Sequence, residues 1–308
     1  MARRYDRFNE FRRWKSLRFI VFLFLLITAV CCPLTIIFTT DIHEHLFSFD
    51  PQGFAYGPMN IRDFARNMEL EDALFLDAGD LFDSKVQVPF FADSRNETLR
   101  YLSSAKYDAM VLGNHEFYFG SAWLENYKAS NKALIGANVP NLPSFRIFER
   151  EGKRIAVVGL TTSQHLANQV EHYGKMPTDP LEALSRALHE MPSVDFIICL
   201  NHLQHELDLE ILKRFPQVDL ILSGHDHRGP EITTEGSRVL FEGSCYNDSV
   251  FLIEVNLETK EMHYKTIKPY VTVSESQQFS SAIKRDIATG IVLGSLLGIA
   301  LLLKSVIP

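Results

Sequence analysis

Side chains of the types that bind metal ions follow five apolar segments of this chain, at 34–40, 73–78, 108–112, 194–200 and 218–223. These side chains are Asp41, His43, Asp80, Asn114, His202, His225 and His227. Ligands of an open α/β sheet bind in the crevice outside the carboxyl ends of its strands. If the five segments are strands of a shared sheet, the seven side chains meet in one place. They are sufficient for two cations.

The donor set indicates hydrolytic metal chemistry. It contains imidazoles, carboxylates and an amide oxygen but no thiolate, which suits Mn²⁺, Zn²⁺ or Fe and differs from a cysteine-rich structural zinc site. Asp80 follows Gly79, and a carboxylate at such a turn can give one oxygen to each of two ions. Water bridging two such ions loses a proton near neutral pH, and the resulting hydroxide can attack phosphorus. We therefore expect a dinuclear-metal phosphohydrolase that cleaves a phosphate ester.

His115 is the candidate catalytic residue, because it follows Asn114 directly and extends from the same loop. From there it can protonate the leaving oxygen or stabilise the transition state. Glu116 comes next, and it either orients one of these two side chains or caps the following turn.

The elements that would position these residues alternate between short β-rich runs and helical stretches from residue 34 to about 270, as in an α/β domain. We expect helices at 60–70, 93–105, 122–130, 180–191 and 206–215. Besides the five segments above, we expect strands at 132–137, 154–159, 238–241, 249–256 and 262–267, with the late strands forming an antiparallel edge.

Both ends of the chain carry apolar segments. Residues 1–33 join a basic cluster to an apolar run, 271–286 form a polar linker, and 287–303 form a second apolar run. We expect a membrane-anchored protein with an extracytoplasmic catalytic domain, since the basic cluster stays cytoplasmic. A cleavable signal peptide at the N-terminus and a glycolipid-anchor signal at the C-terminus are the alternatives.

Charge and cysteine usage narrow the partners. Residues 1–18 hold seven Lys/Arg and two Asp/Glu, which gives this segment a charge of +5. Because the net charge of the whole chain is −7, the remaining residues carry a charge of −12. An acidic body argues against nucleic acid as a partner. The four cysteines show no framework spacing, so we interpret them as small apolar residues rather than disulfide partners.

The ordered motifs resemble those of the calcineurin-like metallophosphoesterases. They are Asp41-x-His43, Gly79-Asp80, Gly113-Asn114-His115-Glu116, Asn201-His202 and Gly224-His225-x-His227, and the surrounding residues are most similar to the catalytic domain of 5'-nucleotidases. The resemblance implies a four-layer α-β-β-α sandwich. It also implies one metal held by Asp41, His43, Asp80 and His227, and another held by Asp80, Asn114, His202 and His225.

The chain departs from that pattern at Tyr118, where the nucleotidases usually have an aspartate that supports the catalytic histidine. Unless Asp83 or another acid takes this part, the pKa of His115 is expected to fall. The last expected strand is followed by the apolar segment rather than by the base-binding domain of the nucleotidases, so we do not expect nucleotide specificity to be inherited. A phosphodiesterase or pyrophosphatase acting on a lipid head group and a catalytically silent binding relative are the alternatives to hydrolysis of a phosphorylated small molecule.

Overall fold

The computed structural model describes residues 33–45, 48–50, 53–56, 65, 69–83, 94–164, 177–246, 248–267 and 271–272. Its first large sheet has the order β13-β12-β1-β4-β5. The strands are β1 (Leu34–Thr39), β4 (Leu74–Asp77), β5 (Ala109–Met110), β12 (Val250–Val255) and β13 (Met262–Ile267). The strands β1, β4 and β5 are parallel, whereas β12 and β13 add an antiparallel hairpin at one edge.

The second large sheet has the order β10-β11-β9-β8-β7-β6. Its strands are β6 (Phe145–Arg150), β7 (Lys153–Thr161), β8 (Phe196–His202), β9 (Leu220–Gly224), β10 (Glu231–Glu235) and β11 (Arg238–Glu242). The four central strands are parallel, and β6 and β10 pair antiparallel at the edges. A smaller sheet contains β2 (Ser48–Asp50), β3 (Gly53–Tyr56) and β14 (Val271–Thr272).

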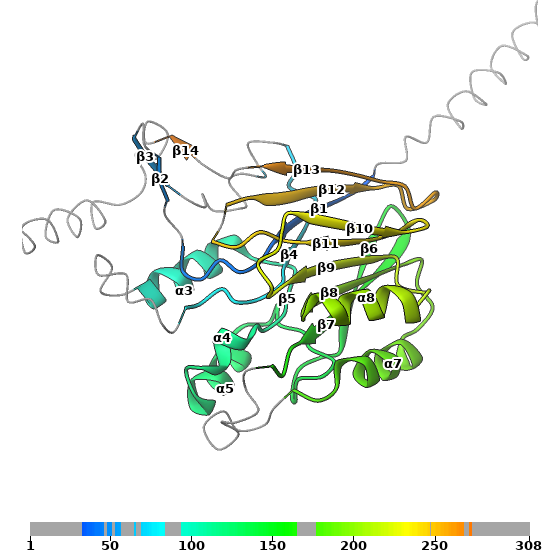
Figure 1. The fold of residues 1–308 in the computed structure, drawn as a ribbon, viewed down its shortest axis with the longest axis horizontal. Helices are drawn as coiled ribbons and strands as arrows, with labels where there is room; N and C mark the ends of the chain where they lie inside the picture. Colours follow the sequence, from blue (N-terminus) through cyan, green and yellow to red (C-terminus); the bar gives the residue numbers. More distant parts are fainter. Residues whose placement is uncertain are drawn as a thin grey trace, which may run out of the picture. The chain divides into compact units, whose positions relative to one another are not determined.

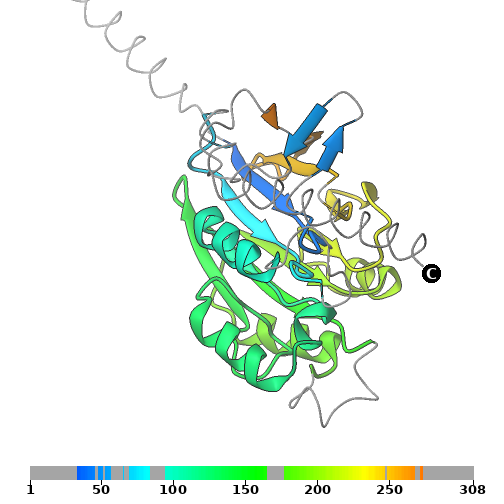
Figure 2. The ribbon, with the colours of Figure 1, turned by 90° about the vertical axis from the view of Figure 1, so that its left-hand side faces the viewer.

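The two large sheets pack face to face with helices on their outer faces. The helices are α3 (Ser94–Ala105), α4 (Asn114–Phe117), α5 (Ser121–Ser130), α7 (Pro180–Glu190) and α8 (His205–Arg214). One apolar cluster joins the inner faces of the two sheets, a second joins the first sheet to α3 and α5, and a third joins the second sheet to α7 and α8. Figure 1 shows α7 and α8 against the second sheet, and Figure 2 shows the side with α3 and α5.

The side-chain alternation of a strand explains how one strand serves two layers. In β1, Ile36 and Phe38 point to the other sheet, whereas Ile37 lies in the cluster beneath α3 and α5. All three are at most 1% exposed. Strands buried on both faces become continuous apolar runs, which is the pattern found in the sequence.

Most expected elements are present, with limits that differ by a few residues. The expected strand at 132–137 is wrong: among the described residues this stretch makes one isolated bridge, between Leu134 and Met110, and no ladder. The chain turns at Gly136, whose N–H donates to the carbonyl of Pro143. The pairing with β5 therefore ends after this single bridge. The edge strands β6 and β10 were not expected, and almost all of the expected helix at 60–70 lies outside the described residues.

Of the late strands expected to form one antiparallel edge, β12 and β13 do so in the first sheet. The strand β11 instead belongs to the second sheet. Among the described residues, no helix is both long enough and apolar enough to cross a membrane. The apolar segments expected at 19–32 and 287–303 lie outside those residues.

Candidate metal centre

The seven candidate ligands follow strands of both large sheets. Asp41 and His43 follow β1, Asp80 follows β4 and Asn114 follows β5, all in the first sheet. His202 ends β8, and His225 and His227 follow β9, in the second sheet. The five strands therefore do not share one sheet but divide between two, as the family resemblance implied, because the chain crosses to the second sheet after β5. The side chains nevertheless come together, because the two sheets pack against each other.

Five of the candidate ligands have left-handed backbone conformations, which non-glycine residues seldom adopt. The φ angles are 49° for Asp41, 49° for His43, 52° for Asp80, 95° for His225 and 54° for His227. Each such residue costs of the order of 1 kcal/mol, and such strain is concentrated at functional sites. The backbone therefore turns sharply at each strand end and directs these side chains toward one another.

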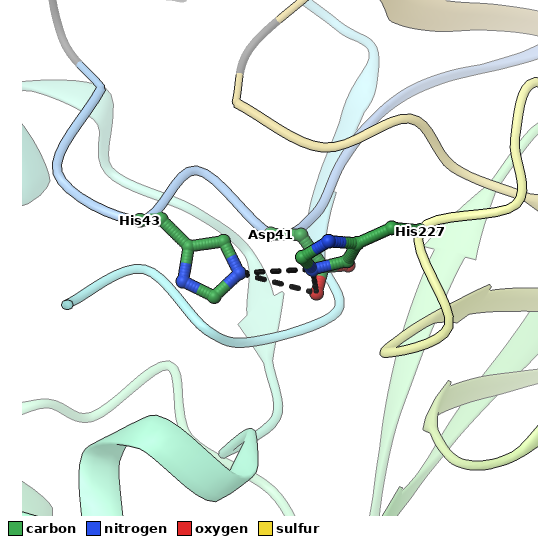
Figure 3. Close-up of side chains that lie close together, drawn as sticks. All are labelled: Asp41, His43 and His227. Carbon is green, nitrogen blue, oxygen red and sulfur yellow. Dashed lines mark hydrogen bonds and ion pairs between the residues drawn. The ribbon is translucent and has the colours of Figure 1, made fainter. Parts of the chain in front are cut away.

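The first cluster consists of Asp41, His43 and His227 (Figure 3). The Nε2 atoms of His43 and His227 are 3.0 Å apart, and they lie 3.7 Å and 3.1 Å from Oδ1 of Asp41. The hydroxyl of Thr40 donates to the other oxygen of Asp41 at 2.6 Å. Three donor atoms from two sheets thus converge on a small volume.

The second cluster surrounds Asp80. Nε2 of His202 lies 3.3 Å from Oδ2 of Asp80 and 3.3 Å from Oδ1 of Asn114. Nδ1 of His202 lies 2.7 Å from the carbonyl oxygen of Ala78, which identifies Nδ1 as a protonated nitrogen and leaves Nε2 directed at Asp80. Because Nε2 of His43 is also 3.8 Å from Oδ2 of Asp80, this carboxylate connects the two clusters.

His225 extends the second cluster toward two amides that the sequence analysis did not identify. Its ring centroid is 5.0 Å from that of His202, and its Nε2 lies 3.1 Å from Nε2 of Gln204 and 3.2 Å from Oε1 of Gln164. Gln164 comes soon after β7, the neighbour of β8, so the rule that selected the other strand ends could also have selected it.

The electrostatics of the centre favour bound cations. Burial opposes the charges of Asp41 and Asp80, but hydrogen bonds and charges from the surrounding histidines hold the pKa of each carboxyl below its usual range. Burial also opposes the charge of His202 and lowers its pKa, but the carboxylates of Asp80 and Asp41 outweigh burial and raise this pKa to about 10. Burial and the charge of His202 lower the pKa of His225 to about 4. In the protein without metals, a proton on His202 therefore supplies the positive charge that two buried carboxylates require.

The donor geometry fits metal ions better than hydrogen bonds alone. A single N–H can lie between the Nε2 atoms of His43 and His227, so hydrogen bonding satisfies one of these atoms at the other's expense. Two nitrogens bound to one tetrahedral ion at about 2.0–2.1 Å lie roughly 3.4 Å apart, close to the separation found here. The buried Nδ1 of His43 has no hydrogen-bond partner, so no second interaction in the described residues fixes its tautomer.

His115 lies at the edge of both clusters. Its Nε2 is 3.9 Å from Oδ2 of Asp80, and its Nδ1 is 3.5 Å from Oδ1 of Asp83. Burial lowers the pKa of His115, and the charges of Asp80 and Asp83 oppose this shift. Asp83 therefore lies where the missing aspartate would be needed. Tyr118 instead accepts a hydrogen bond from the amide of Asn114 at 3.1 Å, which orients that ligand candidate.

Glu116 connects the loops that carry Asp80 and Asn114. Its carboxylate accepts hydrogen bonds from the N–H groups of Asp80, Leu81, Phe82 and Gly113, at 2.7–3.3 Å. Its bond to Gly113 also caps the short helix α4. Glu116 thus acts on the backbone of both loops rather than on the side chains of Asn114 or His115.

Comparisons with known proteins agree with this geometry. The family model of the calcineurin-like phosphoesterases matches residues 34–229. The probable 5'-nucleotidase of Treponema pallidum (strain Nichols) is 31% identical, over 63% of this chain and 36% of that protein. The trifunctional nucleotide phosphoesterase protein YfkN of Bacillus subtilis (strain 168) is 27% identical, over 63% of this chain and 16% of that protein. The chain thus spans less than two fifths of the length of either relative.

Solved structures share the fold. The crystal structure of the 5'-nucleotidase precursor from Thermus thermophilus aligns with a TM-score of 0.62 and 22% identity, over 86% of this chain and 59% of that chain. At this identity the likeness concerns the fold alone. The family match covers all five motifs, and it confirms the resemblance inferred from them. The chain belongs to the calcineurin-like phosphoesterase family.

Proposed function

We propose that this protein is a metal-dependent phosphohydrolase that uses two divalent cations to hydrolyse a phosphate ester. The observation that carries the proposal is the position of one carboxylate oxygen. Oδ2 of Asp80 lies 3.3 Å, 3.8 Å and 3.9 Å from the Nε2 atoms of His202, His43 and His115. Asp80 therefore lies between two groups of ligand candidates and beside the proton donor candidate.

The ligand candidates divide around Asp80. Asp41, His43 and His227 would hold one cation, and His202, His225 and Asn114 would hold the other, with Asp80 shared. When bound, two divalent cations supply the positive charge that activates a water molecule and neutralises a phosphate group. The donor set is compatible with Mn²⁺, Zn²⁺ or Fe.

His115 would hold the proton for the leaving oxygen at Nε2. Asp83 lies 3.5 Å from Nδ1, and its charge favours the protonated imidazole, although burial leaves the pKa of His115 below its ordinary value. A proton donor with a lowered pKa releases its proton readily, but a smaller fraction of it is protonated at neutral pH. Because the named relatives are nucleotide phosphoesterases and 5'-nucleotidases, phosphorylated small molecules, and nucleotides among them, are the substrate class we propose.

The test is a screen of the purified full chain, with added Mn²⁺ or Zn²⁺, against phosphomonoesters, phosphodiesters and pyrophosphates. We expect turnover that a chelator removes and that Asp80→Asn abolishes, with Asp72→Asn, at an exposed aspartate, as the matched control. A protein that binds two metal ions but turns over none of these substrates would instead be a catalytically silent binding relative. Turnover that survives in Asp80→Asn would contradict the assignment of the shared ligand.

A phosphodiesterase or pyrophosphatase acting on a lipid head group is the second candidate, because apolar segments at 19–32 and 287–303 flank the domain in the sequence. Membrane attachment, the extracytoplasmic position of the site and the division into domains at 33, 270 and 286 remain predictions. Assaying soluble and vesicle-borne substrates with and without both segments separates the two candidates. Undiminished turnover of soluble monophosphates by the shortened protein would count against a lipid substrate.

A further inference from the structure

An exposed aromatic ring borders the candidate metal centre. In the part of the chain that the structure describes, the large hydrophobic side chains that are exposed are Tyr246, at 46%, and Tyr264, at 52%. The centroid of the Tyr246 ring is 5.4 Å from that of His43, 5.4 Å from that of His227 and 4.6 Å from that of His45. Two of these neighbours are candidate ligands of the first cluster. The ring of Tyr246 therefore contacts the centre and keeps nearly half of its surface open.

The backbone holds this ring in place at an energetic cost. The N–H of Tyr246 donates to the carbonyl of Asp41 at 2.8 Å, which fixes the residue to the loop carrying the first ligands. Its φ is 56°, a left-handed conformation that suits glycine or asparagine better than tyrosine. An aromatic residue that is both strained and exposed contributes little to folding, so its position requires another explanation.

The ring of Tyr246 lies beside His43, as does the proton donor candidate His115. The rings of His115 and His43 have centroids 4.6 Å apart, so His115 and Tyr246 both border His43. The leaving oxygen has to lie within hydrogen-bond reach of its proton donor. The amides of Gln204 and Gln164 instead lie around His225, which neighbours His202. A leaving alcohol that receives its proton from His115 is therefore held next to His43, the ring that Tyr246 also borders.

We propose that Tyr246 is a specificity-determining residue, on whose exposed ring a planar group of the leaving alcohol stacks. This inference rests on the phosphohydrolase function proposed above and adds the chemistry of the substrate beyond its phosphate. An aromatic face binds any flat ring, because stacking needs no hydrogen-bond pattern. The preferred substrates are therefore monoesters of alcohols that carry a planar ring, such as nucleosides.

The test compares adenosine 5'-monophosphate with ribose 5-phosphate, since both release a primary alcohol and differ in the attached base. We expect Tyr246→Ala to lower kcat/KM for the nucleotide by about 10-fold, the size of one stacking contact, and to change kcat/KM for the sugar phosphate by less than about 2-fold. Tyr246→Phe keeps the ring and is expected to restore the preference. Tyr264→Ala, which removes the other exposed tyrosine, is the matched control and should leave both values unchanged.

The outcomes separate this inference from the proposed function. A wild-type protein that, with its metals bound, hydrolyses no phosphoester in the wider screen would overturn the proposed function and this inference together. If the wild type is active but Tyr246→Ala lowers kcat/KM for both substrates by the same factor, or lowers the metal content, the stacking role alone is overturned. The ring would then support His43 and His227. A preference for the nucleotide that survives in Tyr246→Ala would also overturn the stacking role.

Discussion

Gly113→Ala tests how tightly the bridging carboxylate is held. The backbone of Gly113 is extended, with φ −90° and ψ −174°, so an alanine can adopt its conformation without strain. A Cβ at this position, however, would lie 2.0 Å from Oδ1 and 2.6 Å from Cγ of Asp80, although real contacts of a Cβ are not found under 3.0 Å. One methyl group therefore forces Asp80 or its loop to move.

The displacement can be converted into an effect on activity and stability. To reach an ordinary contact, the carboxylate has to shift by about 1 Å or more. It would then lose the hydrogen bond from the N–H of His115 at 2.8 Å and its 3.3 Å approach to His202. A misplacement of about 1 Å in a catalytic site costs roughly 10²-fold in rate. Overpacking together with a lost buried hydrogen bond lowers the free energy of unfolding by about 2–4 kcal/mol.

The assay measures kcat/KM with Mn²⁺, the metal content of the protein and urea unfolding for Gly113→Ala and for Gly236→Ala. At Gly236 a Cβ meets no atom within 4 Å, but φ is 64°. That control should lose about 1 kcal/mol of stability through backbone strain and keep full activity. If Gly113→Ala retains activity within about threefold of the wild type, against the roughly 10²-fold loss expected, the reasoning that Gly113 holds the carboxylate in place is refuted.

Three further changes test the surroundings of the centre and the centre itself. Asp208 is a buried residue of α8 that accepts a hydrogen bond from the amide of Asn201, the neighbour of His202. Burial raises the pKa of Asp208 to about 8, so the folded protein keeps a proton that the unfolded chain loses. Stability should therefore fall as pH rises from about 4 to 8. Asp208→Asn should flatten this slope in urea unfolding, and an unchanged slope would contradict the assignment. His115→Gln should lower kcat by about 10²–10⁴-fold at unchanged metal content. In the wild type, activity should fall as pH rises through a value below 6.5, because burial lowers the pKa of His115. If activity instead falls only at a pH well above 6.5, the proton donor is another group. Chelation should lower the melting temperature, because cations that bind only the folded chain stabilise it, and added Mn²⁺ should restore the melting temperature. Equal melting temperatures would argue against a metal site.

The types and order of the site residues could be predicted from the sequence, because they depend on local patterns. An apolar run followed by a glycine and a polar residue marks the end of a buried strand. This rule located Asp80 and Asn114 without any knowledge of which strands pair. The helices α5 and α7 were predicted within one residue at each end for the same reason, since periodicity and caps are local.

The tertiary structure decided how those residues meet. The distribution of the five strands over two sheets depends on pairings between distant segments, as between β1 and β12, which no local pattern encodes. For the same reason, the structure and not the sequence decided that Asp83 lies 3.5 Å from His115 and that Tyr246 lies beside His43. Local order thus determined which chemical groups the chain carries at its strand ends. The packing of two sheets determined the distances between those groups, because side chains far apart in the sequence approach one another only when both sheets have formed.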